Sequence, residues 1–472
     1  MERVNITVVA NRLKKEIVGC RELLPLKKSI KKLTGSRKSW PPLVIGDLVV
    51  PTPIIQGGMG VGISLSSLAS AVTNAGGIGV IAANGIGLLE KGYFQNGEEA
   101  NIRALRKEIQ RARTLTDGPI GVNIMVAISD FTKLLSVCIE EKVELLFLGA
   151  GLPIKGIDVP AIRKANIKVV PIVSGERAAA MIWRMWEKLY NDTPDAVVVE
   201  GPKAGGHLGF SAEQIEDPSH QLEAIIPRVK AALSPFEVSQ NKHIPIIAAG
   251  GVHTGGDIHR LLALGASAVQ MGSRFVATDE CDADLRFKEA FIAAKKEDIG
   301  LIDSPVGMVG RAIRNKFIHD SEAGQRPAFR CAYPCLATCK AQEAHYCISI
   351  ALNNARKGNL ASGFVFAGAN AHRIKRIVPV ASLIGELQSG YERALATTLN
   401  RLLNRFTALK GELVAAQSAL AELAQSYDTA FLALLPAKDR LIERQYRRAA
   451  ALAERIRLKM SETALQAALL LS

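Results

Sequence analysis

The sequence predicts an α/β protein: a (β/α)8 TIM barrel followed by a C-terminal α-helical, coiled-coil-like extension. Two observations support this fold class. From residue 51 onward, short apolar runs rich in β-branched residues alternate with longer segments of helical period, which is typical of repeated βα units. Beyond about residue 390, the composition changes to Ala, Leu, Arg, Glu and Gln. We therefore divide the 472 residues into a basic N-terminal extension (1–40), a barrel (41–390) and a helical extension (391–472).

Eight apolar runs are the candidate barrel strands. They fall at residues 53–57, 78–83, 119–126, 143–149, 167–173, 195–200, 244–250 and 266–272. Several are followed directly by glycine, which would bring glycine-rich loops together at one rim of a closed barrel. An open doubly wound sheet has a similar rhythm, but no Gly-x-Gly-x-x-Gly fingerprint stands between a first strand and its helix.

The two ends of the chain carry much of the net charge of +14. Residues 1–40 hold eleven Lys or Arg against three Glu, and residues 391–472 hold twelve basic against eight acidic residues. The N-terminal arm lacks interleaved aromatic residues and an uninterrupted apolar stretch, so we interpret it as a solvated or partner-binding extension rather than a nucleic-acid-binding arm or a signal peptide. No segment reaches about 18 uncharged apolar residues, the length that spans a bilayer. We expect a cytoplasmic protein that binds neither nucleic acid nor a membrane.

The C-terminal extension contains an apolar stripe at alternating steps of four and three residues. Its members are Leu395, Leu399, Leu402, Phe406, Leu409, Leu413, Ala416, Leu420, Leu423 and Tyr427. Pro436 should end this helix, and a second amphipathic segment from about Lys438 to Leu470 either folds back as a hairpin or reaches a partner. Packing on its own barrel and formation of a homo-oligomer through these helices both stay open.

A histidine on a glycine-rich loop is the first candidate for a catalytic residue. His207 lies in Glu200-Gly-Pro-Lys-Ala-Gly-Gly-His-Leu-Gly209, directly after the sixth run. Loops at the C-terminal ends of the strands carry the chemistry of α/β barrels, and the neighbouring glycines let a flat ligand approach the backbone. We therefore interpret His207 as a catalytic base; a histidine that only packs in its loop is the alternative.

Other loops of the same rim suit a phosphorylated planar cofactor. The loops Ala248-Ala-Gly-Gly-Val252 and Gln270-Met-Gly-Ser-Arg274 expose backbone N–H groups after the seventh and eighth runs, where this barrel usually binds phosphate. Asn123, in the third run, can hydrogen-bond a ring carbonyl or N–H, and the backbone of Gly57-Gly58-Met59 can face the ring. Each motif alone is weak, because a Gly-Gly pair after a strand is usually only a turn. Their joint order along eight strands is a stronger indication.

These motifs resemble the nitronate monooxygenase (2-nitropropane dioxygenase-like) family of FMN-dependent TIM-barrel enzymes, which is related to the flavin-containing enoyl-acyl carrier protein reductases. The resemblance covers about residues 41–388 and rests on the loops above together with Pro53-Ile-Ile-Gln-Gly-Gly-Met59 and Gly121-Val-Asn123. It implies bound FMN and His207 as the base beside the flavin ring. The residues that we expect at the cofactor are Gly58, Met59, Asn123, Glu200, Lys203, Gly205, Gly250, Gly251, Gln270, Met271, Gly272 and Ser273.

Two of these residues depart from the pattern of the family. Glu200 stands where many nitronate monooxygenases have glutamine, and Lys203 stands where they often have glutamate. The substrate is therefore less constrained by the resemblance than the cofactor.

The resemblance implies a flavin-dependent monooxygenase that oxidises alkyl nitronates or nitroalkanes with O2 to a carbonyl compound and nitrite. A neutral imidazole can remove the acidic α-proton of a nitroalkane, whereas a preformed nitronate needs no base. The same motifs are as close to enoyl reductases, which use NAD(P)H to reduce an enoyl thioester. A third alternative is a flavin-barrel subunit that its helical extension recruits to a larger biosynthetic assembly.

Four of the seven cysteines fall in one short stretch. Cys331, Cys335, Cys339 and Cys347 are spaced C-x3-C-x3-C-x7-C within a Cys-rich loop at 331–347. In an intracellular chain such clustering favours metal over disulfides, and four thiolates suit an iron–sulfur cluster or zinc. The spacing matches neither the common zinc sites nor the bacterial ferredoxins, so free buried thiols in a loop over the substrate are the third alternative.

Two further segments have no chemistry assignable from their spacing. The stretch Ser304-Pro-Val-Gly-Met-Val-Gly-Arg311 is loop-like and lies where it could cover the cofactor. His253 precedes Thr254-Gly-Gly-Asp257, which predicts a solvent-exposed helix start capped by Thr254 or Asp257.

Overall fold

The computed structural model describes residues 40–325, 329, 331, 333–337, 339–432 and 436–471. Residues 1–39, and with them nearly all of the basic extension, lie outside the described part. By packing, Pro41–Leu387 forms one compact unit, and Gln388–Ser472 belongs to a second.

Eight parallel strands form the barrel that the sequence predicts. They are β3 (Ile54–Gln56), β4 (Gly79–Ala82), β5 (Ile120–Met125), β6 (Leu145–Gly149), β7 (Lys168–Val173), β8 (Val197–Glu200), β10 (Ile246–Ala249) and β11 (Ala268–Met271). The strand order is β3-β11-β10-β8-β7-β6-β5-β4. Hydrogen bonds from Gln56 N to Ile78 O (2.9 Å) and from Ile78 N to Ile54 O (3.0 Å) join the two edges. The closed α/β barrel is confirmed, and each of its strands lies inside one of the predicted runs.

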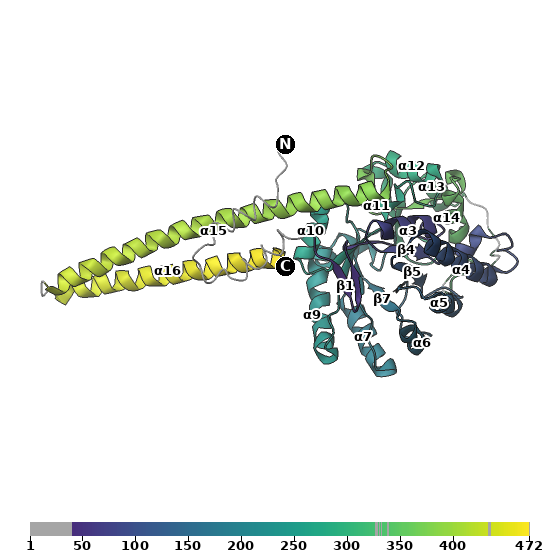
Figure 1. Cartoon of the computed structure of the whole chain (residues 1–472). Helices are drawn as coiled ribbons and strands as arrows, with labels where there is room; N and C mark the ends of the chain where they lie inside the picture. Colours follow the sequence, from purple (N-terminus) through teal and green to yellow (C-terminus); the bar gives the residue numbers. More distant parts are fainter. Residues whose placement is uncertain are drawn as a thin grey trace. The chain divides into compact units, whose positions relative to one another are not determined.

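Helices follow the strands and surround the sheet (Figure 1). They are α3 (Ser66–Asn74), α4 (Gly97–Leu115), α5 (Phe131–Glu140), α6 (Val159–Lys164), α7 (Glu176–Tyr190), α8 (Ala212–Glu216), α9 (Leu222–Gln240), α10 (Gly255–Ala263), α11 (Ser273–Val276) and α12 (Leu285–Ala293). Thr254 caps α10 in a capping box with Asp257, as predicted. His253 beside it is buried, however, so the predicted solvent exposure of this helix start is wrong.

A short hairpin packs into the interior at the amino ends of the strands. Strands β1 (Leu43–Ile45) and β2 (Leu48–Val50) pair antiparallel. Leu43, Ile45 and Val50 are buried in one cluster with barrel residues that include Leu145 and Ala268. Burial of each such aliphatic side chain stabilises the fold by roughly 1.5–3 kcal/mol. Because this end is filled, the open end of the barrel is the rim at the carboxyl ends of the strands.

A small antiparallel sheet lies beside that rim. It contains β12 (Ile299–Asp303), β13 (Val309–Ile313) and β14 (Val365–Phe366), and the two-residue strand β9 (Gly206–His207) pairs with β13. Helices α13 (Lys316–Glu322) and α14 (Ile348–Arg356) flank the Cys-rich loop. The sheet therefore ties the loop of His207 to a hairpin about one hundred residues further along the chain.

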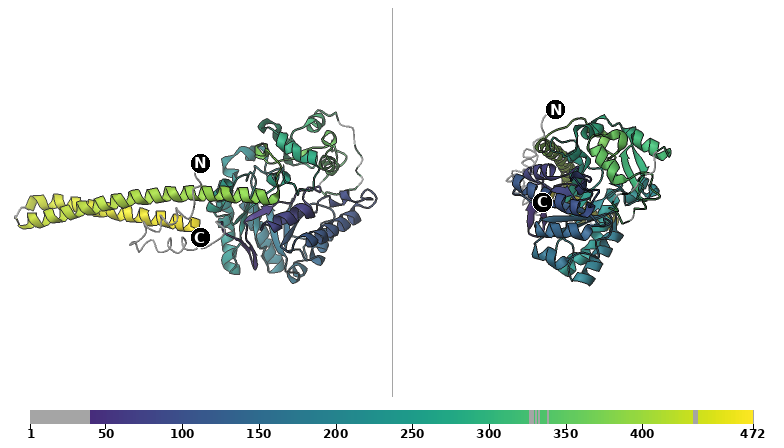
Figure 2. Two further views of the ribbon diagram at one scale, coloured as in Figure 1. Left: turned by 45° about the horizontal axis from the view of Figure 1, so that its top comes forward. Right: turned by 90° about the vertical axis from the view of Figure 1, so that its right-hand side faces the viewer.

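Two long helices end the described chain. Helix α15 (Val380–Leu432) is followed by α16 (Pro436–Leu471), and Figures 1 and 2 show α16 running back alongside α15. Proline at the first position of α16 needs no backbone N–H partner, which explains why it starts a helix there. Five predicted stripe members are buried and three are half-buried, in register with the heptad: Leu395, Leu399, Phe406, Leu409 and Ala416, then Leu402, Leu413 and Leu420. The side chains of Leu423 and Tyr427 lie outside the described part. None of the described helices has the length and apolar character to cross a membrane.

Candidate active site

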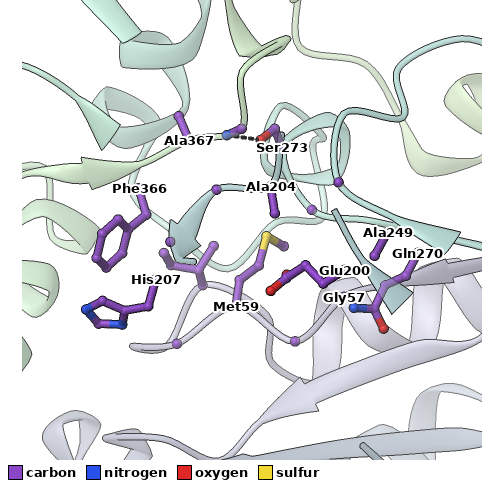
Figure 3. Close-up of a pocket in the computed structure, with 18 of the residues that line it drawn as sticks. Gly57, Met59, Glu200, Ala204, His207, Ala249, Gln270, Ser273, Phe366 and Ala367 are labelled. Atoms are coloured by element: carbon purple, nitrogen blue, oxygen red, sulfur yellow. Dashed lines mark hydrogen bonds between the residues drawn. The ribbon is translucent and has the colours of Figure 1, made fainter. Parts of the chain in front are cut away.

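A cavity of about 320 Å³ lies at the carboxyl ends of the strands, and every residue predicted for the cofactor or for catalysis lines it (Figure 3). The lining residues include Gly58, Met59, Asn123, Glu200, Lys203, Gly205, His207, Gly250, Gly251, Gln270, Met271, Gly272 and Ser273. They come from five strand ends spread over more than two hundred residues of sequence. Closure of the barrel is what brings them together.

His207 is held on three sides. Strand β9 pairs His207 with Gly310 of β13, and the imidazole packs edge-on against Phe366, with ring centroids 5.1 Å apart (Figure 3). Its Nε2 lies 2.7 Å from Ser304 Oγ. Burial lowers the pKa of His207 to about 4, because desolvation penalises the imidazolium. At neutral pH the imidazole is therefore uncharged and can accept a proton.

Ser304 is a site residue that the sequence analysis missed. It is buried where the hairpin between β12 and β13 turns, and hydrogen bonds from Ser304 N to Met308 O and from Gly307 N to Ser304 O fix that turn. Ser304 and His207 are 97 residues apart in sequence. A serine before Pro-Val-Gly predicts a turn, but nothing local indicates which side chain the hydroxyl will face.

The loops after β10 and β11 present free backbone donors to the cavity. In the described part of the chain, the N–H groups of Gly250, Gly251, Gly272 and Ser273 donate to no protein acceptor. All four residues are half-buried and line the cavity, so their N–H groups are available to an anionic ligand group. This arrangement fits the phosphate of a flavin mononucleotide.

Gly58 packs directly against Asn123 in the wall of the cavity. A Cβ atom added at Gly58 would lie 2.4 Å from Asn123 Cβ, so only glycine fits beside that side chain. Asn123 Nδ2 donates to Phe147 O (3.1 Å), which fixes the amide at the cavity wall. The glycine thus keeps Asn123 in a position where its amide group can line the cavity.

Glu200 places a carboxyl group in the same cavity. It ends β8 in register with Ala249 of β10, and Figure 3 shows it on the wall near Gln270. Burial raises the pKa of Glu200 to about 7. The carboxyl is therefore neutral in mildly acidic solution and becomes anionic as the pH rises above 7.

A second segment that the sequence did not reveal, residues 368–370, packs against the loops of the cavity. Gly368 N donates to Ser273 Oγ (3.0 Å), and Asn370 Nδ2 donates to Gly251 O (2.5 Å). The buried Arg311 of β13 donates to the carbonyls of Pro202 and Ala204 and so fixes the loop that leads to His207. These contacts connect residues more than ninety positions apart, and no local sequence pattern reveals them.

The iron–sulfur or zinc site predicted in the Cys-rich loop stays a prediction. The described residues include all four of its cysteines, and among them no three His, Cys, Asp or Glu side chains are arranged to hold a metal ion. Cys331 Sγ instead contacts Tyr333 O and Cys335 Sγ contacts Ser349 Oγ, both at 3.3 Å. Burial raises the pKa of Cys335, which keeps that thiol protonated. These four cysteines are half-buried and form no disulfide in the described part of the chain.

A comparison with known proteins identifies the family of this chain. The family model described as nitronate monooxygenase matches residues 43–134 and 124–390. This chain belongs to the nitronate monooxygenase family. As a member of that family it is a flavin-dependent oxidoreductase, in accord with the backbone N–H groups that line its cavity.

Proteins that are similar to this chain carry different names. A probable nitronate monooxygenase of Staphylococcus saprophyticus is 29% identical over 314 residues, which cover 58% of this chain and 79% of the relative. An octahydro-indene carboxyl-CoA dehydrogenase of Rhodococcus jostii is 28% identical over 273 residues, which cover 58% of this chain and 65% of the relative. The solved structure of FabK from Thermotoga maritima has 30% identity and a TM-score of 0.57, and the match covers 74% of this chain and 95% of FabK.

Proposed function

We propose that this protein binds FMN in the cavity and oxidises alkyl nitronates and nitroalkanes with O2 to a carbonyl compound and nitrite. The observation that carries the proposal is a neutral imidazole, held by a serine hydroxyl, on the wall of a cavity that also presents free N–H donors. The N–H groups of Gly250, Gly251, Gly272 and Ser273 would hold the phosphate, and the surface formed by Gly58 and Asn123 would support the ring.

The residues of this chain prepare the substrate. His207 accepts the α-proton of a neutral nitroalkane at one ring nitrogen, and the hydrogen bond to Ser304 fixes the orientation of the ring. Lys203 lines the same cavity, is exposed and forms no ion pair in the described part of the chain, so it attracts the resulting anion. Bound flavin supplies the electron-transfer and oxygen chemistry, which is intrinsic to the cofactor.

The test is anaerobic reduction of the flavin by two donors, side by side. We expect a nitronate to bleach the flavin absorbance quickly, and nitrite to form once O2 is admitted. Rapid bleaching by NADH or NADPH, with no response to nitronates, would contradict the proposal.

Reduction of an unsaturated thioester is the second candidate. It is favoured by the relative whose name specifies a CoA-linked substrate, and by the neutral Glu200 carboxyl, a proton donor that nitronate oxidation does not need. In the same assay, this candidate predicts that NADH or NADPH bleaches the flavin absorbance and that an enoyl thioester then reoxidises the flavin.

Self-association through the C-terminal helices is a further part of the proposal. The heptad stripe on α15 is already buried within the single chain, but Val414, Leu452 and Leu458 stay exposed on the two helices and would be covered in an oligomer. Size-exclusion chromatography of a chain cut at residue 390 should give a smaller assembly than the full chain, relative to its mass. An unchanged oligomeric state would contradict this role of the helices.

Ser304→Ala should slow the turnover of a neutral nitroalkane by about threefold to tenfold, because one hydrogen bond that orients His207 contributes roughly 0.5–1.5 kcal/mol. Turnover of the preformed nitronate should change little, since that substrate needs no base. The measurement is kcat/KM with both substrates at equal flavin content. Ser321→Ala is the matched control, because Ser321 is a buried serine whose hydroxyl has no hydrogen-bond partner in the described part.

Glu200→Gln should change the pH profile. In the native enzyme kcat/KM for a nitronate should fall by about fivefold as the pH rises from 7 to 9, because half of Glu200 is already ionised at pH 7 and the ionised form repels the anionic substrate by roughly 1.4 kcal/mol. Glutamine stays neutral, so the variant should keep a flat profile over this range. Glu213→Gln, at an exposed position of α8, should behave like the native enzyme. An equal fall in Glu200→Gln would assign the ionisation to another group.

A further inference from the structure

A second cavity, of about 220 Å³, adjoins the phosphate end of the first one. Arg274 lines both cavities, since it directly follows the loop of Gly272 and Ser273. Arg373, Lys375 and Arg376 complete the cationic lining, and Glu386 is the single carboxylate among the lining residues. The proposed chemistry in the first cavity uses none of these four cations.

The positive charge of this cavity is only partly neutralised. Glu386 accepts a hydrogen bond from Arg274 Nη2 at 3.0 Å, and its other oxygen lies 3.8 Å from Arg376 Nη2. Arg373 and Lys375 form no ion pair within the described ranges. Arg373, Lys375 and Arg376 are exposed, so water screens part of their mutual repulsion, and an anion bound between them would lower it further. The lining therefore carries an excess of three positive charges over its one carboxylate.

The neighbouring histidine does not add to this charge. His253 Nε2 lies 3.3 Å from Arg274 Nη1. Burial, with the charges of Arg274 and Arg373, lowers the pKa of His253 to about 4. His253 is thus neutral at physiological pH and helps to orient the guanidinium of Arg274.

One segment connects Arg373, Lys375 and Arg376 to the loops that we propose for the flavin phosphate. Gly368 N and the Asn370 amide contact Ser273 and Gly251, and Ala369 N donates to Lys203 O at 3.1 Å. The chain then makes a short turn at Ala371–Arg373 and reaches Lys375 and Arg376. The phosphate of FMN would already be bound by the free N–H groups of the first cavity. The second cavity thus has charge for a different phosphorylated group.

We propose that the second cavity is a binding site for the phosphate groups of an adenosine nucleotide that carries a ribose phosphomonoester, the chemistry shared by coenzyme A thioesters and NADPH. Guanidinium groups bind phosphate oxygens in pairs, and Lys375 adds a point charge. The site is distinct from the flavin site.

The test uses the flavin-loaded full chain and four probes in calorimetric titrations: coenzyme A, 3′-dephospho-coenzyme A, NADPH and NADH. Coenzyme A should bind about tenfold more tightly than 3′-dephospho-coenzyme A, or NADPH about tenfold more tightly than NADH, or both. The double variant Arg373→Gln/Lys375→Gln should remove that preference, at unchanged flavin content. Whether coenzyme A or NADPH shows the preference identifies the source of the nucleotide.

A matched control separates local binding from overall charge. Arg184→Gln/Lys164→Gln removes the same net charge from exposed positions on α7 and α6, and should leave the preference intact. The proposal is overturned by equal losses in the two double variants or by the absence of any phosphomonoester preference. Loss of flavin from Arg373→Gln/Lys375→Gln would also overturn it, because the cavity would then belong to the flavin site. Failure of nitronate oxidation alone leaves these binding results unaffected, so the two proposals fail separately.

Discussion

Replacement of His207 by Asn should abolish turnover of a neutral nitroalkane while preserving most of the turnover of the preformed nitronate. Asparagine cannot accept the α-proton, and a positioned general base typically contributes 10²- to 10⁴-fold. The nitronate has already lost that proton. The decisive measurement is the ratio of kcat/KM values for nitroethane and ethyl nitronate, in the native enzyme and in His207→Asn.

The pKa of His207 adds a second readout. Since burial lowers that pKa to about 4, the base stays unprotonated well below pH 6.5, and the acid limb of the nitroalkane profile should lie near pH 4. The nitronate profile should lack this limb. Equal losses on both substrates in His207→Asn, at full flavin content, would contradict a role in proton abstraction and indicate a role in binding.

Gly250→Ala should cause the largest loss of cofactor binding and stability. The φ angle of Gly250 is +95°, which strains any other residue, and an added Cβ would lie 2.7 Å from Gly201 O and 3.1 Å from Ala204 N. The left-handed conformation alone costs roughly 1–2 kcal/mol. The close contacts must also displace the loop that leads to His207. We expect flavin to be lost on purification and a Tm lower by several degrees.

Substitutions at two other glycines separate the cost of the left-handed backbone from the cost of the close contacts. Gly324→Ala places a side chain at φ +69° with no atom of the described residues within 4 Å, so it tests the conformational cost alone. Gly175→Ala has an extended backbone and equally open surroundings, so it should be nearly neutral. Flavin content and Tm of the three variants should fall in the order Gly175, Gly324, Gly250. If Gly250→Ala retained flavin and melted like Gly324→Ala, the contacts with Gly201 and Ala204 would not matter.

The eight strands could be predicted because their signal is local. A run such as Leu145–Leu148 is apolar throughout, since the strand is covered on both faces, and the glycine after it marks the rim. The rim loops were found for the same reason: each follows its own strand, and the barrel brings all strand ends to one side. The heptad stripe on α15 is also local, so its buried members could be named in advance.

The residues that sequence reasoning missed depend on contacts between distant segments. Ser304 touches His207 only because β9 pairs with β13, and Asn370 reaches Gly251 across 119 positions. The Cys-rich loop depends on such contacts as well. Four thiols near one another in sequence form a metal site only if the loop turns them toward a common centre, and spacing alone does not determine that; Cys331 contacts Tyr333 O and Cys335 contacts Ser349 Oγ.

The sequence by itself determined the barrel, the rim that carries the site and the residues that the strand-end loops bring to the cavity, because periodicity and strand-end glycines are properties of short segments. Only the tertiary structure decided what His207 is bonded to, how its surroundings keep it neutral, and that Arg274, Arg373, Lys375 and Arg376 surround a second cavity. Hydrogen-bond partners, desolvation and the gathering of like charges depend on which distant segments meet in space. The order of residues along one segment does not contain that information.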